Sequence, residues 1–149
     1  MVSKKNHSPT DPYLFRNAAK TSNNRAVLAA MTNKQSYDSG VISKNEIIWL
    51  LSRAKGGFGI ITTAAANVSM EGKGWKGELG VFDDIHIPNL KKLTTAVHSY
   101  NSLIFAQLFH GGMRSPESLT GKQPISASKI KCEESFTGFN RSASTQDIN

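Results

Sequence analysis

Hydrophobic residues along the chain fall into three continuous apolar runs, and two segments with helical spacing lie between them. The runs are residues 25–31 (RAVLAAM), 59–63 (GIITT) and 103–108 (LIFAQL), and each has the length of a buried strand. None of them alternates apolar with polar residues over its whole length, which predicts a parallel sheet covered on both faces. Residues 1–23 are polar, and we expect them to be irregular.

The first predicted helix spans residues 44–55. It follows Ser43-Lys44-Asn45-Glu46, which has the S-x-x-E form of a capping box, with the Glu46 carboxylate able to reach back to the cap. Apolar residues then recur at helical spacing until Gly56-Gly57 ends the pattern; they are Ile47, Leu50, Leu51 and Ala54.

A second helix is predicted around Pro88, a residue that suits the first turn of a helix. Its apolar face consists of Leu90, Leu93, Ala96 and Val97, and Asn101 can serve as its left-handed cap. Residues 33–42 are rich in turn formers, residues 64–86 form a long Gly-rich connection, and the chain from Phe109 onward is mostly loop-like.

The order strand, helix, strand, helix, strand indicates right-handed crossovers, in either a (β/α) barrel or an open doubly wound sheet. Neither G-x-G-x-x-G nor G-x-x-x-x-G-K-[ST] occurs, so the usual phosphate-binding loops are not found. In both architectures the functional residues follow the carboxyl ends of strands. Here those positions are Met31-Thr32, Ala64-Ala65 and Leu108-Phe109-His110.

The composition is that of an ordinary globular domain, with 149 residues, 38% of them hydrophobic and 19% charged. The net charge of +7 leaves open a binding module for anionic partners. However, the lysines are dispersed and no nucleic-acid motif is present, so a solvated basic surface is the favoured interpretation and no nucleic-acid partner is expected.

Membrane insertion and secretion are not predicted. No apolar run approaches the roughly 18–20 residues that span a bilayer, and no apolar segment follows the lysines near the N-terminus. The single cysteine, Cys132, cannot form an intrachain disulfide, which fits a reducing compartment and leads us to expect a cytoplasmic protein.

Glu78 with Asp83-Asp84 could suggest a metal, but helix capping and loop solvation are the favoured roles, and no metal site is predicted.

Five segments carry a more specific signal. They are NRAVLAAMT (24–32), RAKGGFGIIT (53–62), GVFDD with IPNL (80–84 and 87–90), QLFHGGMR (107–114) and PISAS (124–128). In this order and spacing they resemble the first part of the old yellow enzyme (NADH:flavin oxidoreductase) family. The resemblance covers roughly residues 24–128.

This resemblance implies a TIM barrel that holds FMN at the carboxyl ends of its strands and uses hydride from NAD(P)H to reduce activated alkenes, such as enone-like small molecules. By the resemblance, Ala29, Ala30, Met31 and Thr32 line the flavin, with the Thr32 hydroxyl near its O4/N5 edge. Ala65 contributes backbone contacts, and Gln107 faces the pyrimidine edge. The side chains suit these roles, since a flavin needs a mostly apolar cradle and Gln107 offers both a donor and an acceptor. No catalytic residue is assigned, and for His110 a structural hydrogen bond is the favoured role.

The chain also departs from the family pattern. Ala30 replaces a proline common in the first strand, Lys34 occupies a frequent active-site tyrosine position, and Ala64 replaces an acidic residue. A TIM barrel usually takes about 250 residues, so residues 24–149 are expected to be the truncated first part of a barrel that is not closed. The last residues, from Ser144, resemble the capped start of the third helix.

The family's His-Asn or His-His pair and its phosphate loops have no counterpart here. His86 and Asn89 have suitable spacing, but Pro88 marks them as a helix start. Three hypotheses follow: a fragment with little activity alone, a half-barrel that acts with a second chain, and a non-enzymatic anion-binding module.

Overall fold

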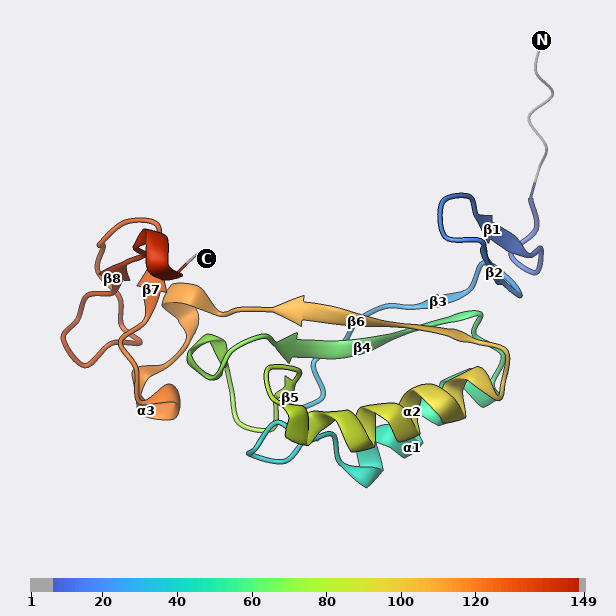
Figure 1. Ribbon diagram of the computed structural model, residues 1–149, viewed down its shortest axis with the longest axis horizontal. Helices are drawn as coiled ribbons and strands as arrows, with labels where there is room; N and C mark the ends of the chain where they lie inside the picture. The colour runs from blue at the N-terminus through green and yellow to red at the C-terminus, as the bar shows by residue number, and fades with distance from the viewer. Residues whose placement is uncertain (1–6, 148–149) are drawn as a thin grey trace, which may run out of the picture.

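The computed structural model describes residues 7–147, and its centre is a parallel β-sheet (Figure 1). The strands of this sheet are β3 (Val27–Leu28), β4 (Ile60–Asn67), β5 (Leu79–Gly80) and β6 (Leu103–Phe109). Strand β4 is central and pairs in parallel with the other three. The architecture is therefore α/β, and the described residues do not close the sheet into a barrel.

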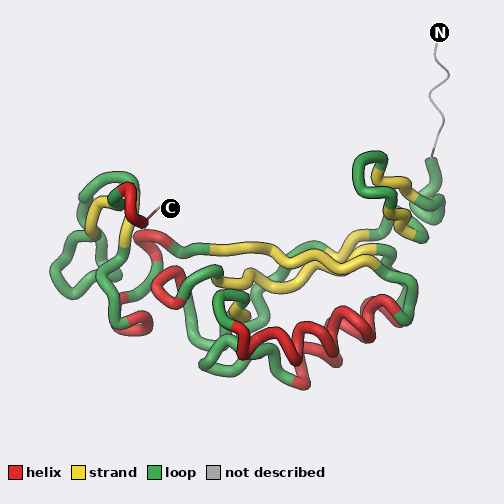
Figure 2. The backbone as a smooth tube through the Cα atoms, in the orientation of Figure 1, coloured by secondary structure: helices red, strands yellow, loops and turns green. Residues whose placement is uncertain are grey.

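Two helices, α1 (Lys44–Lys55) and α2 (Ile87–His98), lie on the same side of this sheet (Figures 1 and 2). The core between helices and sheet consists of Leu28, Ile42, Leu50, Ala54, Ile61, Ala66, Leu79, Leu93 and Val97. Both predicted helices are confirmed: Pro88 lies in the first turn of α2, and Asn101 has a left-handed φ of 56°. Neither these helices nor any other in residues 7–147 combines the length and apolarity needed to cross a membrane.

The predicted capping box at the start of α1 is only half formed. Ser43 Oγ accepts a hydrogen bond from the Glu46 amide (3.2 Å), as expected. The Glu46 carboxylate does not reach back to the cap; it accepts from Asn33 Nδ2 (3.0 Å) and Ser36 Oγ (2.6 Å) instead. Glu46 is fully buried, so it ties the loop that follows β3 to helix α1.

The strand boundaries differ from the predicted ones in two places. Strand β3 covers only two residues of the predicted run 25–31, because β4 is its only partner among the described residues and their pairing ends at Leu28. Strand β4 continues past Thr63 to Asn67, where it pairs with both β5 and β6. Residues 64–67 therefore belong to the sheet and not to the predicted connection.

The prediction that residues 1–23 are irregular is wrong for part of the described segment. Strands β1 (Tyr13–Phe15) and β2 (Lys20–Ser22) form an antiparallel hairpin, with Ala19 in a left-handed turn conformation (φ 47°). The Phe15 ring lies 6.3 Å from the ring of Phe105 in β6, so contact with the sheet stabilises a hairpin that polar composition alone does not reveal. Residues 1–6 lie outside the described part, and the division of the chain at residue 24 stays a prediction.

The chain after β6 is mostly loop, as predicted, with short elements. They are η3 (Gly112–Arg114), α3 (Glu117–Thr120), β7 (Ile125–Ser126), β8 (Arg141–Ser142) and η4 (Thr145–Asp147). Asn140 is fully buried and donates to Ser126 Oγ and Ser128 O, both at 2.8 Å, which joins β7 to the segment before β8. The predicted helix start at Ser144 is one 3₁₀ turn in the described residues, and positions 148–149 lie outside them.

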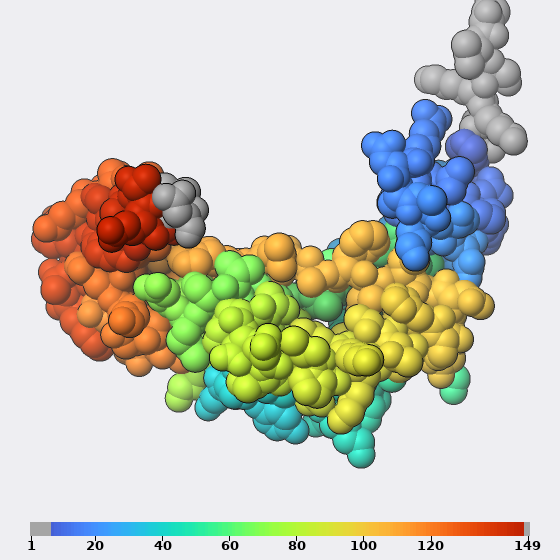
Figure 3. Space-filling view, viewed as in Figure 1, coloured from blue at the N-terminus to red at the C-terminus, as the bar shows by residue number. Residues whose placement is uncertain are grey.

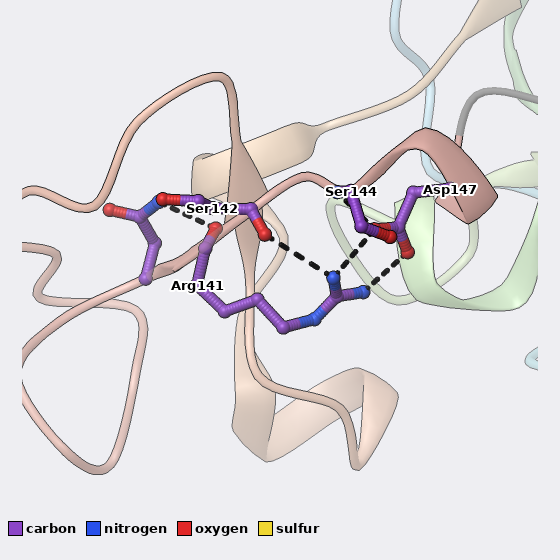
Figure 4. A network of polar contacts seen from close by, with 5 residues as sticks. Arg141, Ser142, Ser144 and Asp147 are labelled. Carbon is purple, nitrogen blue, oxygen red and sulfur yellow. Dashed lines mark hydrogen bonds and ion pairs between the residues drawn. The ribbon is translucent and has the colours of Figure 1, made fainter.

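A bidentate ion pair holds this last turn against β8 (Figure 4). The two terminal nitrogens of Arg141 each donate to a different carboxylate oxygen of Asp147 at 2.7 Å. Asp147 also accepts from the amide and the hydroxyl of Ser144, at 2.6 and 2.8 Å. The Arg141 hydrogen bonds, followed by those of Ser144, lower the pKa of the Asp147 carboxyl well below its ordinary value of 3.8.

We expect Arg141→Gln to raise the pKa of Asp147 toward 3.8, because the main stabilising partner of the carboxylate is lost. An NMR titration of the Asp147 carboxyl carbon measures this pKa directly. Because the folded-state pKa is depressed, the stability that this pair contributes is present above pH 3.8 and is lost as the pH falls toward the folded-state pKa. The control Arg16→Gln, in the N-terminal turn, should leave the titration unchanged, and an unaltered pKa in Arg141→Gln would disprove the coupling.

Candidate functional site at the carboxyl edge of the sheet

The carboxyl ends of β3, β4 and β6 meet at one edge of the sheet, because the three strands are parallel. All six residues predicted to contact a flavin lie toward this edge. Ala65 is in the last half of β4 and Gln107 is in the last half of β6. Ala29, Ala30, Met31 and Thr32 follow β3 directly, outside the strand.

Ala65 and Gln107 are brought side by side as register partners of β4 and β6. A β-bulge makes this pairing possible: Thr62 pairs with Phe105, and three residues later Ala65 pairs with Gln107. The hydroxyl of the buried Thr63 lies at the bulge. It donates to Ala64 O (2.7 Å) and accepts from the backbone amide of Gln107 (3.3 Å). Bulges re-aim strand residues near functional sites, and this one was not predicted.

One face of the sheet at this edge is open. Leu28, Ile61 and Ile104 are register partners that pack toward the helices. Because side chains alternate along a strand, Phe105 and Gln107 lie on the opposite face, which no helix of the described residues covers. Phe105 is 47% exposed, so the predicted cover on both faces is absent from this part of the chain. The N-terminal hairpin and the C-terminal segment stand at either end of the molecule (Figure 3).

The segment after β3 leads into a tightly held loop. Ala30 is half-buried, whereas Ala29, Met31 and Thr32 are exposed. Lys34 then adopts a left-handed backbone (φ 52°), and its carbonyl packs so close to Gly77 that a Cβ there would lie 2.5 Å from the Lys34 oxygen. Gly77 is itself left-handed (φ 73°), so this contact requires glycine.

Three further hydrogen bonds join this loop to the connection between β4 and α2. The amide of Ser36 donates to Gly77 O (3.1 Å), and the amide of Gly80 donates to Gly40 O (2.8 Å). The buried ammonium of Lys73 donates to Asp38 O (2.5 Å). These hydrogen bonds therefore hold the loop of residues 33–42 against the connection between β4 and α2, next to the candidate site.

Glu78 is buried, which corrects the prediction that it is a solvated loop residue. It is 1% exposed, and its Oε2 accepts from the Gly74 amide (2.7 Å). Burial raises the pKa of the Glu78 carboxyl above its ordinary value of 4.5, against the backbone hydrogen bonds of Gly74 and Trp75 and the charge of Lys73, which lower it. Asp83, by contrast, caps η2 (Asp84–His86) by accepting from the Ile85 amide, as expected.

The raised pKa of Glu78 gives a pH prediction. The folded chain holds the Glu78 proton more tightly than the unfolded chain does, so the associated stability is complete below pH 4.5 and is lost as the pH rises through the folded-state pKa. We expect Glu78→Gln, which keeps an acceptor for Gly74 but cannot ionise, to lose less stability over this rise than the parent chain does. Urea denaturation between pH 4 and 8 measures the difference, and parallel pH profiles for the two chains would contradict it.

Two histidines have structural roles, as predicted. His110 Nδ1 accepts from the Gly112 amide (3.0 Å), and its ring lies against Gly72, where a Cβ would approach it to 2.4 Å. His86 lies in η2 directly before α2, so its spacing to Asn89 is that of a helix start. The sequence did not reveal the role of Thr63 in the bulge, the burial of Glu78, or the contact between the rings of Trp75 and Phe109, which are 5.2 Å apart. The unbroken run of small residues up to Asn67 was the available signal for the longer strand.

Comparison with known proteins decides the family. The model of the NADH:flavin oxidoreductase / NADH oxidase family matches residues 12–149. The chain belongs to this family. Members of the family and old yellow enzyme homologues use FMN, with NAD(P)H as the reductant.

Individual members are similar over most of this chain. It is 36% identical over 115 residues to YqiG of Bacillus subtilis, named as a probable NADH-dependent flavin oxidoreductase, covering 77% of this chain and 30% of that protein. It is 35% identical to an NADH:acrylate oxidoreductase of Vibrio harveyi, covering 80% of this chain and 12% of that protein. The solved old yellow enzyme homologue of Zymomonas mobilis superposes with a TM-score of 0.81 at 28% identity, over 95% of this chain and 41% of that enzyme. This member of the family thus spans less than half the length of these relatives.

Proposed function

We propose that this chain provides one wall of the FMN site of an NAD(P)H-dependent oxidoreductase of the ene-reductase type, and that its sheet is the first part of a TIM barrel. The pairing of Ala65 with Gln107 toward the carboxyl edge of the sheet, the edge to which residues 29–32 lead from β3, carries the proposal. Ligands of parallel α/β folds bind at this edge.

The side chains at the edge fit a flavin ring. Ala29, Ala30 and Ala65 are small enough to leave room for a flat ring, and Met31 adds apolar surface. The Gln107 amide carries both a donor and an acceptor, which matches the mixed edge of a pyrimidine, and it is exposed on the open face. The Thr32 hydroxyl supplies a further donor, and Ala65 offers its backbone.

FMN, when bound, supplies hydride transfer from NAD(P)H to an activated alkene such as a small enone. The residues of this chain would orient the ring: by the family resemblance, Gln107 would hold the pyrimidine edge and Thr32 would donate near the O4/N5 edge. The matched part of the old yellow enzyme homologue is 41% of its length. By the family resemblance, the histidine pair and the phosphate loops lie in the remainder, so we expect little activity from this chain alone.

Gln107→Ala tests the proposal. Titration of the purified full chain with FMN, followed by quenching of flavin fluorescence, should give saturable binding. Loss of one or two hydrogen bonds to the ring should weaken this binding about tenfold in Gln107→Ala, since about 1.4 kcal/mol corresponds to that factor. Addition of NADPH and cyclohexenone should give no steady turnover.

The matched control is Gln146→Ala, which removes an exposed glutamine from η4 and should bind FMN as the parent chain does. Failure of the parent chain to bind FMN would overturn the proposed wall. Equal affinities of the parent chain and Gln107→Ala would overturn the role of Gln107, and steady turnover would overturn the expected lack of activity.

A second candidate, a half-barrel that assembles with a complementing chain, is favoured by the exposure of β6. Among the described residues this strand pairs only with β4, and its two faces expose Phe105 (47%) and Leu108 (67%). An unpaired edge with apolar residues on both faces is a template for another strand. Light scattering during size-exclusion chromatography should then show a defined complex when the complementing chain is present, and a strictly monomeric folded species under that condition would contradict it.

A further inference from the structure

A buried carboxyl group with one free oxygen lies beside the carboxyl edge. Glu78 immediately precedes β5, whose residues pair with the last two residues of β4. Its Oε2 accepts from Gly74, whereas Oε1 is buried and has no hydrogen-bond partner among the described residues. Burying such a group costs stability, so its presence in this position calls for an explanation.

The carboxyl group closes the turn from Gly74 to Glu78. Its Oε2 accepts from the backbone amide of Gly74 (2.7 Å), and the nearby cation, Lys73, donates to Asp38 O. The carboxyl group therefore closes the turn from within and forms no ion pair with another element among the described residues, while the Ser36 amide holds the turn from outside through Gly77 O.

This turn packs on the end of β6. The rings of Trp75 and Phe109 are 5.2 Å apart with an interplanar angle of 49°, which is a favourable tilted arrangement of aromatic rings. A Cβ at Gly74 would lie 3.2 Å from Cε1 of Phe109, so the turn approaches this ring closely. Phe109 stands two residues after Gln107, and the alternation of side chains places both on the same face of β6.

We propose that Glu78 and Trp75 are positioning residues for the carboxyl-edge site: the Glu78 carboxyl group fixes the 74–78 turn, and Trp75 in that turn fixes the ring of Phe109 beside Gln107. Glu78 acts through Trp75 and touches no ligand. The effect of these contacts on a bound flavin ring rests on the proposed function. The contacts between Glu78, Trp75 and Phe109 can themselves be tested without any ligand.

The experiment uses the fluorescence of Trp75. The chain has two tryptophans, so Trp49→Phe leaves Trp75 as the single emitter in an otherwise complete chain. In this background Glu78→Ala should red-shift the emission of Trp75 and increase its quenching by acrylamide, because the turn is released. Glu78→Gln should keep the parent spectrum, since its amide oxygen can still accept from Gly74.

Two matched controls separate positioning from general destabilisation. Glu71→Ala removes an exposed carboxylate from the same connection and should leave Trp75 unchanged. Phe109→Ala should reproduce the change seen in Glu78→Ala, whereas Leu108→Ala, on the other face of β6, should not. Far-UV circular dichroism of each variant shows whether the helices remain folded.

An unchanged Trp75 spectrum in folded Glu78→Ala would overturn the proposal, as would an equal change in Glu78→Ala and Glu78→Gln. If Glu78→Ala does not fold, an altered spectrum in folded Phe109→Ala supports the Trp75–Phe109 part, and an unaltered one overturns it. Because no ligand is used, failure of the chain to bind FMN would count against the proposed function alone.

Discussion

Leu50→Ala should lower the free energy of unfolding by about 2–5 kcal/mol, the range for removing a leucine side chain from a packed core. Leu50 is fully buried in α1 and belongs to the core between helices and sheet. Its removal takes contacts from both layers at once, because the core joins α1 to β4 and α2. Urea denaturation monitored by circular dichroism measures the loss.

Ile48→Ala is the matched control, since it removes a side chain of the same size from the same helix. Ile48 is 53% exposed, so its truncation should cost about 0.5 kcal/mol. If Leu50→Ala does not fold, Leu50→Met keeps the volume and should cost less than about 1.5 kcal/mol. Similar losses for Leu50→Ala and Ile48→Ala would mean that the buried face of α1 is wrongly assigned.

Glu46→Ala should destabilise the chain by about 2–4 kcal/mol, because hydrogen bonds to a buried charged group are stronger than neutral ones and their partners lose their acceptor. The carboxylate accepts from Asn33 and Ser36, and Ser36 is buried. The loop that carries Lys34 would be released from α1. Urea denaturation gives the energy, and hydrogen exchange of residues 33–42 should rise more than that of α2.

Glu46→Gln keeps one acceptor oxygen and should recover part of the loss. Glu71→Ala, which removes an exposed carboxylate, should change the stability by no more than about 0.5 kcal/mol. Equal exchange rates of residues 33–42 in Glu46→Ala and the parent chain would show that the loop is held by its contacts with Gly77 and not by Glu46.

The helices could be predicted from the sequence because their signals are local. A cap at Ser43, the glycine pair at 56–57 and the apolar spacing between them act within one or two turns, and α1 has the predicted bounds. Pro88 and Asn101 mark α2 in the same way. Even here the Glu46 side chain was wrongly assigned, because its partners Asn33 and Ser36 reach α1 only through the tertiary fold.

Strand lengths depended on partners far along the chain. Strand β3 ends at Leu28 because its pairing with β4 ends there, and β4 extends to Asn67 because β5 and β6 both pair with its end. The bulge at Thr63 depends on the register between β4 and β6, which are separated in the chain by β5 and α2. No local pattern of residues reports such a register.

The sequence by itself determined the α/β order of elements, the two helices and the family, since five ordered motifs and local helix signals do not depend on distant contacts. Through the family resemblance it also indicated six candidate flavin contacts, which lie in or near the later parts of the predicted strands. Only the tertiary structure decided that Ala65 lies beside Gln107, that Glu78 is buried, that Trp75 packs on Phe109, and that no helix covers one face of the sheet among the described residues. The physical reason is that register, burial and side-chain partners arise between segments distant in the chain, whereas helix caps and apolar spacing arise within one segment.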